Sequence, residues 1–330
     1  MDPISQGALG AALPQSVSTT EKLRTFAWLG CLSGLAPDLD VFIRSATDPI
    51  LFLEYHRQFT HALVFIPVGA LICTLAFYWF ARRTLRFRET FLACALGYGT
   101  HALLDACTTY GTMLLWPFSD ARIAWNNVSV VDPLFTLPLL GLVITSVYLR
   151  RPGFARAGLL WALVYLGFGV IQRDRAEAFG TELAMELGHA PLRLEAKPGF
   201  ANLFLWKIVY ETETDFHVSA VRLFLTPKHF PGQSVRKLVV ANDLPWLDPG
   251  SQQANDLARF DWFSNRYLAL DPTRPNYVID IRYSMIPNEI QPLWGILLDP
   301  AAGPGEHVRY VTDRSGGPER AAQLRQMLLD

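Results

Sequence analysis

Residues 62–81, ALVFIPVGALICTLAFYWFA, form an apolar stretch that contains no charged side chain. A helix needs about 20 mostly apolar residues to cross the hydrocarbon core of a bilayer, and this stretch has that length. Residues 132–149 and 157–171 are similarly apolar, although the second of these is short. The sequence therefore predicts a protein whose first half is embedded in a membrane.

Two weaker candidate spans are interrupted by ionisable residues. Residues 90–115 contain His101 and Asp105, and residues 25–43 contain the sequence PDLD at positions 37–40. With these two included, we predict about five membrane-spanning helices. An ionisable side chain inside a span costs free energy unless it is paired, solvated or bound to an ion, so each one is a lead to function.

The character of the sequence changes near residue 172, where charged residues begin to alternate with short apolar runs typical of strands. The predicted strands are residues 204–213, 216–225, 235–242, 267–271, 277–284 and 290–298, with helices at 173–188 and 318–329 and a turn at Pro231-Gly232. We therefore predict a multi-pass α-helical membrane domain at residues 1–171. A soluble α+β domain, mainly antiparallel β, is predicted at residues 172–330.

The basic residues predict an orientation in the membrane. Lys22 and Arg24 precede the first predicted span, and two groups of arginines follow the second and the fourth. These groups are Arg82, Arg83, Arg86 and Arg88, and Arg150, Arg151 and Arg156. Because cytoplasmic loops carry an excess of Lys and Arg, all three groups are assigned to the cytoplasm. Five spans then place the C-terminal domain outside the cytoplasm.

The overall composition argues against two kinds of protein. The formal net charge is -1, so the sequence carries no sign of a nucleic-acid partner. The four cysteines lie in or beside apolar segments and include no CxxC spacing. We therefore predict buried thiols rather than disulfides or a cysteine metal site.

Six Asp and His side chains lie within the predicted spans or at their ends: Asp38, Asp40, His56, His61, His101 and Asp105. His101 and Asp105 are four residues apart, so they share one face of a helix. In the predicted orientation all six side chains lie at one level near the outer face of the membrane. Three carboxylates and three imidazoles suit a divalent metal, with Zn²⁺ as the first choice and Mn²⁺ or Fe as alternatives. We predict that all six residues are metal ligands.

Catalytic roles are predicted for three residues of this region. Arg57 can hold a phosphate or a developing negative charge, and Asp40 and His61 are predicted to act in the reaction itself. A pair of metal ions bridged by carboxylates would bind both the attacking and the leaving oxygen of an ester. The loop at residues 116–131 is predicted to close over the site, with Asp120, Trp125, Asn126 and Asn127 as polar candidates.

Simpler structural roles compete with these predictions. A single Asp at the end of a span is often a solvated helix boundary, and Arg57 can extend its charge to lipid headgroups. Asp132 precedes Pro133 and is predicted to cap a helix, while Gly97 is predicted to allow close helix packing. The histidines of the second half have no ligand spacing and are predicted to be structural or surface residues: His189, His217, His229 and His307.

Four motifs together resemble the family of LexA-binding, inner-membrane-associated metal-dependent hydrolases. They are MDPISQGALGAAL (1–13), PDLD (37–40), HRQFTHAL (56–63) and HALLDACTTYGTMLLWPFSDARIAWNNVSVVDP (101–133). The resemblance covers about residues 1–150 and implies a bacterial inner-membrane hydrolase whose polar signature matches the six Asp and His residues. HALLD is also similar to an element of zinc phospholipases C, which points to phosphoester chemistry. Family members often carry His near position 6, where this chain has Gln6.

The sequence therefore predicts a membrane-bound metal-dependent hydrolase that acts on a membrane-associated ester, such as a phospholipid or a lipid-linked phosphoester. One alternative is a membrane protein whose Asp and His residues conduct protons or metal ions. The other alternative is a binding domain, residues 172–330, anchored by the membrane half. An ion pathway needs polar residues that continue to the cytoplasmic side, and the predicted spans at 62–81, 132–149 and 157–171 lack them. This difference favours a one-sided site. The predicted partners are a lipid or lipid-linked substrate and the membrane, and the sequence predicts nothing about a protein partner.

Overall fold

The computed structural model describes residues 1–313, 315 and 317–329, and it divides into two compact units. The first unit contains Met1–Phe42, Tyr55–Ile171 and Phe200–Asn202. The second contains Ile43–Glu54, Gln172–Gly199 and the chain from Leu203 onward. The chain thus passes from the first unit to the second after Ile171, and residues 43–54 belong to the second unit although they lie within the sequence of the first.

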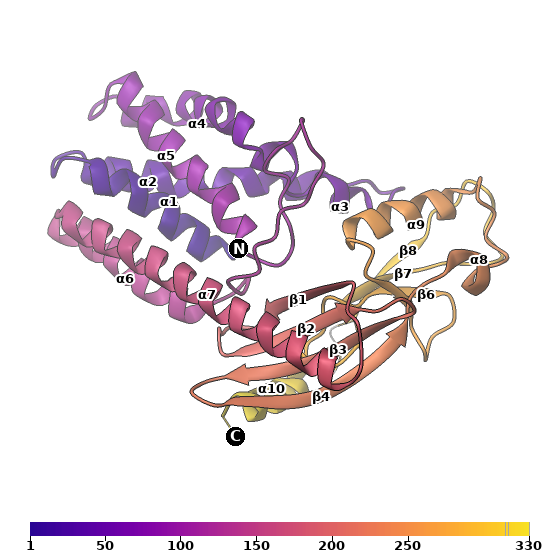
Figure 1. Cartoon of the computed structure of the whole chain (residues 1–330). Helices are drawn as coiled ribbons and strands as arrows, with labels where there is room; N and C mark the ends of the chain where they lie inside the picture. The colour runs from indigo at the N-terminus through magenta and orange to yellow at the C-terminus, as the bar shows by residue number, and fades with distance from the viewer. Residues whose placement is uncertain (314, 316, 330) are drawn as a thin grey trace. The chain divides into compact units, whose positions relative to one another are not determined.

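The first unit is helical, and Figure 1 shows its helices running alongside one another. Its elements are α1 (Pro3–Val17), α2 (Leu23–Leu35), the 3-10 helices η1 (Ala36–Phe42), η2 (Phe59–His61) and η3 (Leu63–Phe65), α4 (Ile66–Ala81), α5 (Phe87–Ala106), α6 (Pro133–Leu149) and the first part of α7 (Pro152–Glu186). The short helix α3 (Leu51–Tyr55) begins in the second unit and ends in the first. Its last residue immediately precedes His56.

Glycines bring the backbones of α1, α2 and α5 into contact. A Cβ atom added to Gly10 of α1 would lie 2.7 Å from the carbonyl oxygen of Gly30 on α2. A Cβ atom on Gly97 of α5 would lie 2.4 Å from that same oxygen. Real Cβ atoms do not approach backbone oxygen this closely, so only glycine fits. The predicted packing role of Gly97 is confirmed, and it places α5 directly beside the end of α2.

The prediction of a multi-pass membrane domain with about five spans is wrong. In the described part of the chain, two helices are long and apolar enough to cross a membrane: Leu63–Ala81, which joins η3 to α4, and α7. A core helix of a soluble protein is mostly buried, whereas only 22% and 28% of the apolar windows of these two helices are buried. Leu75 and Leu163 are 66% and 69% exposed, so these helices present apolar surface that suits contact with lipid.

The other candidate spans fail for identifiable reasons. Helix α2 has 13 residues, about 20 Å of helix, because the chain becomes a 3-10 helix at Ala36 before it could cross a core of about 30 Å. Helix α6 has 17 residues and contains Pro138. Helix α5 has 20 residues but carries Arg88, Glu89 and Asp105, which lower its apolar character.

The four cysteines are free thiols, as predicted. Cys73, Cys94 and Cys107 are buried, and Cys31 is half-buried. Each lies on a helix of the first unit or directly after one.

The second unit contains two four-stranded antiparallel sheets, each with its strands in sequence order (Figure 1). The first sheet consists of β1 (Arg193–Pro198), β2 (Leu205–Glu211), β3 (Asp215–Leu223) and β4 (Pro227–Arg236). The second consists of β5 (Leu268–Leu270), β6 (Tyr277–Asp280), β7 (Trp294–Leu297) and β8 (Arg309–Thr312). Val209 and Phe216 of the first sheet share a buried cluster with Ile279 of the second. A β-rich domain after residue 172 is therefore confirmed.

The predicted elements of this unit are partly wrong. The predicted turn at Pro231-Gly232 lies inside β4, which is an edge strand, where the missing N–H of proline is tolerated. The predicted strand at 235–242 ends at Arg236 and is followed by the short helix α8 (Val240–Asp243). Neither α8 nor three further elements were predicted, namely β1, β8 and α9 (Gln252–Phe263). The predicted helix at 318–329 is α10 (Gly317–Leu329), and the one at 173–188 is the second part of α7.

Candidate metal centre

Four side chains that offer metal-ligand atoms converge in the first unit. Asp38 lies on η1, His61 ends η2, and His101 and Asp105 share one face of α5. One ligand atom from each of the four lies within 4.8 Å of the other three. Three of these side chains are fully buried, and the side chain of Asp38 is 28% exposed. The predicted convergence of separate helical segments is therefore present in the structure for these four residues.

The spacing of the four atoms matches a tetrahedral metal site. The two Nε2 atoms of His61 and His101 lie 3.0 Å apart. Oδ2 of Asp105 lies 3.2 Å and 3.5 Å from these two nitrogens, and Oδ1 of Asp38 lies 3.6 Å and 3.3 Å from them. Zn²⁺ binds imidazole nitrogen and carboxylate oxygen at about 2.0–2.2 Å, which puts tetrahedral ligands about 3.4 Å from one another. The measured distances lie around this value.

The hydrogen bonds of the two imidazole rings fix the nitrogens that face the centre. Nδ1 of His101 lies 2.6 Å from the carbonyl oxygen of Gly34, which can only accept, so Nδ1 carries a proton. Nδ1 of His61 lies 2.9 Å from the hydroxyl of Thr60, which itself donates to Oδ2 of Asp40, and 3.2 Å from that same carboxylate oxygen. The Thr60 hydroxyl already donates to Asp40, so Nδ1 of His61 is the donor here too. In neutral rings both Nε2 atoms then present lone pairs to each other across 3.0 Å. Such a pair is repulsive unless a proton or a metal cation lies between the two nitrogens.

An orphaned carboxylate oxygen points to the same position. Oδ2 of Asp105 is buried and accepts no hydrogen bond from the described residues. Nε of Arg57 lies 3.0 Å away and supplies charge, but the two atoms are not aligned for a hydrogen bond. The other oxygen, Oδ1, accepts from Nε2 of Gln6 at 2.9 Å and contacts the amino group of Met1. Because a buried carboxylate oxygen without a donor is costly, Oδ2 fits a cation ligand.

Asp40 lies behind the imidazoles rather than among the four converging atoms. Its Oδ1 lies 2.7 Å from Nδ1 of His56, and its Oδ2 accepts hydrogen bonds from the amide of Arg57 at 2.9 Å and the hydroxyl of Thr60 at 2.8 Å. A carboxylate that holds the second nitrogen of a ligating imidazole is the usual support of a metal site. The structure thus gives Asp40 an orienting position toward His61. Asp38, Asp40 and His56 also form a second group of ligand atoms within 4.8 Å of one another.

Arg57 is held in a fixed position beside the centre. Its φ is 66°, a left-handed conformation that is uncommon for a residue other than glycine. The side chain is nearly buried, its Nη1 donates to the hydroxyl of Thr108 at 3.0 Å, and its guanidinium lies 4.9 Å from the centre of the Tyr110 ring. Strained backbone conformations of this kind collect at functional sites. The guanidinium contacts the carboxylate of Asp105, which is one of the four candidate metal ligands.

The charges of the cluster shift the pKa values of its own side chains. Burial by itself raises the pKa of a carboxyl, but hydrogen bonds from His101 and His61 outweigh burial and hold the pKa of Asp38 below its usual range. Burial lowers the pKa of an imidazole, yet the carboxylates of Asp105, Asp38 and Asp40 raise the pKa of His61 to about 10. Without a metal, the cluster therefore retains a proton at His61. A bound dication would take the place of that proton and neutralise the charge of the same carboxylates.

The loop at 116–131 joins the last turn of α5 rather than contributing to the four-atom centre. The amide of Trp125 donates to the carbonyl of Ala106 at 2.6 Å, and the amide of Asn127 donates to the carbonyl of Cys107 at 2.9 Å. Asp120 is exposed. Asp132 caps α6, because its side chain accepts from the amides of Leu134 and Phe135, so the predicted cap is confirmed.

Sequence reasoning did not identify three supporting groups. They are the carbonyl of Gly34, the hydroxyl of Thr60 and the amide of Gln6, which contact His101, Asp40 and Asp105 respectively. A backbone carbonyl leaves no signal in a sequence, and Gln6 lies far along the chain from Asp105. The sequence raised position 6 through its departure from the His of the family that the motifs resemble, and that departure argued against a ligand role and did not predict the contact with Asp105.

The profile of the YdjM inner membrane protein family matches residues 1–176, which is more than half of the chain. The chain belongs to this family. The inner membrane protein YbcI from Escherichia coli (strain K12) is 32% identical over 142 residues, which cover 40% of this chain and 80% of that relative. The uncharacterized protein YfhP from Bacillus subtilis (strain 168) is 25% identical over 160 residues, or 48% of each chain, so the match spans about half of that relative. No solved structure matches.

The family match includes the whole candidate metal centre, since every one of its residues precedes residue 176. Family membership and the relative from Escherichia coli identify an inner membrane protein. LexA binding and metal-dependent hydrolysis, which the motifs imply by resemblance, go beyond the family description and remain predictions.

Proposed function

We propose that this family member is a metal-dependent hydrolase that cleaves an ester at the membrane, with a phospholipid or a lipid-linked phosphoester as substrate. The supporting observation is the convergence of two imidazole nitrogens and two carboxylate oxygens at the spacing of a tetrahedral metal site. The unsatisfied Oδ2 of Asp105 adds to this support. The LexA-binding part of the resemblance stays a prediction and plays no role in this proposal.

In this proposal Asp38, His61, His101 and Asp105 hold one divalent ion, Zn²⁺ first, with Mn²⁺ or Fe as alternatives. When bound, a divalent ion lowers the pKa of a water molecule and polarises the oxygen of an ester. Asp38 is the one partly exposed member of the set, so we place the approach of water and substrate on its side. The buried members hold the ion from the opposite side.

We assign the proton transfer to His56. Its Nδ1 lies 2.7 Å from Oδ1 of Asp40, and its side chain is 22% exposed. A carboxylate on Nδ1 fixes the tautomer and leaves Nε2 free to accept a proton from water, as in other Asp–His pairs. Asp40 then acts through His56 and His61, and Arg57 acts through Asp105. Both are positioning residues in this mechanism.

The surface around Asp38 supports a lipid substrate. Leu39 and Phe42, on the same 3-10 helix, are 62% and 79% exposed. Exposed apolar side chains beside a polar site suit an acyl chain that enters from a membrane. Both residues lie within the family match.

We also propose that the domain after α7 lies outside the cytoplasm. Arginines follow α4 at Arg82 and Arg83 and precede α7 at Arg150 and Arg151. The excess of basic residues on the cytoplasmic side assigns both of these helix ends to the cytoplasm. The C-terminal end of α7 then emerges on the opposite side.

The test uses purified full-length protein loaded with Zn²⁺ and vesicles of phosphatidylethanolamine and phosphatidylglycerol, with products identified by mass spectrometry. We expect His101→Ala to lose both the metal and turnover. His56→Ala should retain the metal but lose about 10²–10⁴-fold in turnover, because only the base is removed. His229→Ala, in the second unit, is the control and should match the native protein. Turnover that survives in His101→Ala would exclude the proposed mechanism.

A second candidate is a metal-handling membrane protein without catalysis. The observation that favours it is the closed ligand set, because four protein ligands are typical of structural zinc whereas catalytic zinc usually keeps an open position. In liposomes that contain the protein, movement of Zn²⁺ or protons that requires His101 would support this candidate. Vesicle hydrolysis without ion flux would support the hydrolase.

A further inference from the structure

The second unit contains a pocket of about 790 Å³ that lies apart from the metal centre in the chain. One face of α9 forms a wall, because Ala254, Leu257, Ala258 and Asp261 recur at helical spacing and all line the pocket. Pockets that hold small molecules measure about 300–1,000 Å³, so this one has sufficient volume. All of the residues that line it follow residue 176, the end of the family match.

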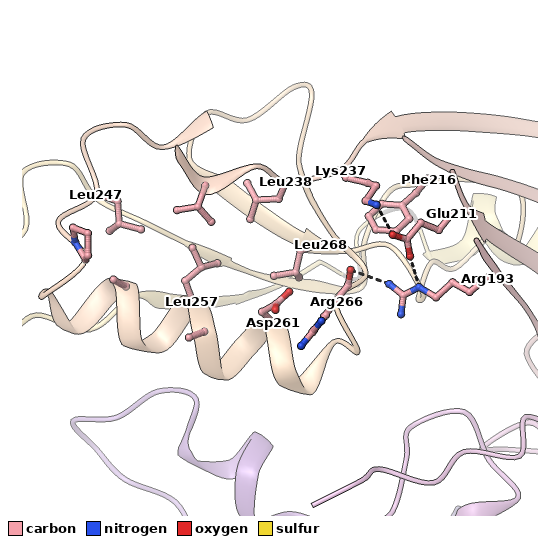
Figure 2. Close-up of a pocket in the computed structure, with 14 residues that line it drawn as sticks. Arg193, Glu211, Phe216, Lys237, Leu238, Leu247, Leu257, Asp261, Arg266 and Leu268 are labelled. Carbon is pink, nitrogen blue, oxygen red and sulfur yellow. Dashed lines mark hydrogen bonds and ion pairs between the residues drawn. The ribbon is translucent and has the colours of Figure 1, made fainter. Parts of the chain in front are cut away.

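The pocket is apolar at one end and charged at the other, as Figure 2 shows. Leu238, Leu247 and Leu257 line the apolar end. At the other end the side chains of Arg193, Lys237 and Glu211 meet. A ligand that fits both ends must itself have an apolar body and a polar head.

The charged end has an excess of positive charge. Glu211 forms ion pairs with both Arg193 and Lys237, so one carboxylate is shared by two cations. Arg266 adds a third cation, and it is exposed. Asp261 is the second carboxyl of the lining, so three cations face two carboxylates and one positive charge is in excess. The head of a complementary ligand is therefore an anion.

Specific contacts fix the position of Arg193 at the charged end of the pocket. Arg193 donates from Nη1 to the carbonyl of Asn265 at 2.6 Å and from Nη2 to the carbonyl of Arg266 at 3.1 Å. Its guanidinium also lies 3.8 Å from the centre of the Tyr267 ring. Asn265 and Arg266 have φ values of 52° and 60°, two consecutive left-handed residues. Such strain persists where surrounding contacts enforce it, and here it places Arg266 at the pocket.

We propose that this pocket binds an amphipathic anion: a single acyl chain that ends in a carboxylate, such as a free fatty acid. The leucines enclose the chain, and the cations at the opposite end bind the carboxylate. Charge-assisted hydrogen bonds from Arg and Lys to a carboxylate provide the orientation. The proposal does not rest on the proposed hydrolysis, because no residue is shared between the pocket and the metal centre.

The experiment uses the full-length protein in phosphatidylcholine nanodiscs with dodecanoate that carries a photoreactive diazirine. After irradiation, mass spectrometry locates the label. We expect labelled peptides from residues 237–268 and competition by unlabelled dodecanoate. Acetate lacks the chain and dodecyltrimethylammonium has the wrong charge, so neither should compete. Label spread over the chain, or equal competition by dodecyltrimethylammonium, would overturn the proposal.

Two variants and a matched control make this test specific. Ala258→Trp adds bulk at an exposed position that lines the pocket, and we expect labelling to fall at least about 10-fold. Asn255→Trp adds the same side chain to the same helix at an exposed position away from the pocket and should label like the native protein. Arg266→Glu keeps the pocket open but reverses a charge, so it should weaken dodecanoate by about 10-fold and leave dodecanol unaffected. Undiminished labelling in both pocket variants would contradict the proposed site.

Discussion

Each of the two units contains a cluster of carboxylates and histidine with ligand atoms within 4.8 Å of one another. In the first unit the cluster is Asp38, His61, His101 and Asp105, and in the second it is Asp48, Asp256 and His307. The two sets contain the same residue types. They differ in the groups that contact their carboxylate oxygens.

In the second cluster a guanidinium occupies the position that a cation would take. Arg259 donates to Asp256 at 2.9 Å, to Asp48 at 2.8 Å and to Glu54 at 2.6 Å. The remaining oxygen of Asp256 lies 2.8 Å from Nδ1 of His307. The guanidinium thus contacts three carboxylates at once. This cluster is a structural ion-pair network.

In the first cluster no described side chain bridges the carboxylates in this way, although the amino group of Met1 forms an ion pair with Oδ1 of Asp105. Arg57 reaches Asp105 from one side, and Oδ2 of Asp105 still lacks a hydrogen-bond donor among the described residues. Two imidazole nitrogens face each other at 3.0 Å. The two clusters therefore have the same residue types but differ in unsatisfied lone pairs, and these lone pairs are the reason that we propose a metal for the first cluster alone.

The largest expected effect is the loss of metal from one cluster only. Replacing His61 by Ala removes a ligand that no neighbour replaces, so the purified protein should lose essentially all of its tightly bound metal. His307→Ala, the matched change in the second cluster, should leave the metal content of the protein unchanged. Inductively coupled plasma mass spectrometry measures both. Equal metal loss in the two variants would remove the distinction between the clusters.

The next effect is on stability and concerns the second cluster. Arg259→Met leaves three carboxylates without their shared cation, and we expect a loss on the order of 3 kcal/mol in the local stability of the second unit. Amide hydrogen exchange should accelerate by about 100-fold in residues 43–54 and 252–263. Metal content should not change. Unaltered exchange would mean that this network contributes nothing to stability.

A smaller effect is expected from the carboxylate that orients the ligands of the first cluster. Asp40→Asn preserves shape but weakens the hold on Nδ1 of His61, and loss of such a support lowers metal affinity by about 10- to 100-fold. Competition with a chelator of known affinity measures the change. A variant that binds metal as tightly as the native protein would show that Asp40 has no orienting role.

The smallest effect concerns a buried lysine of the second unit whose charged form is disfavoured by burial. Burial lowers the pKa of Lys207 to about 7, and its ammonium donates to Ser284 and to the carbonyl of Glu289. The unfolded chain, with a lysine pKa near 10.4, then binds more protons than the folded state above pH 7. Stability should therefore rise by about 1 kcal/mol from pH 7 to pH 8.

Amide hydrogen exchange of β2, corrected for its intrinsic dependence on pH, measures this gain. Lys207→Met has no charge to remove, so it should abolish the rise. A rise that persists in this variant would assign the effect to another group.

The sequence predicted part of the first cluster, for local reasons. The spacing of HALLD put His101 and Asp105 on one helix face, and the structure has both in the four-atom group. Asp38 and Asp40 lie on a 3-10 helix, where residues two positions apart differ by about 240° around the axis. Asp38 belongs to the four-atom group, whereas Asp40 meets Asp38 only in the second group, with His56. This difference depends on the 3-10 conformation of η1, which the sequence pattern did not predict.

The errors in the fold have local and tertiary causes. Span counting treated apolar length as sufficient, but α2 stops at Leu35 and α6 contains Pro138. Pro231-Gly232 has the composition of a turn, yet an added Cβ on Gly232 would lie 2.1 Å from the carbonyl of Val218, so this glycine permits close pairing with β3. Tertiary pairing with β3 decided the case of Gly232, and a single sequence does not contain it.

Residues 43–54 make the two units inseparable by a single cut. The segment joins Asp40 to His56, while its own Asp48 and Glu54 are held by Arg259, more than 200 positions later in the sequence. A truncated chain that ended at residue 171 would keep every residue of the metal centre but would leave this connection without its partners. Any shortened version should therefore also replace residues 43–54, for example with a compact linker, before a loss of activity is attributed to the missing domain.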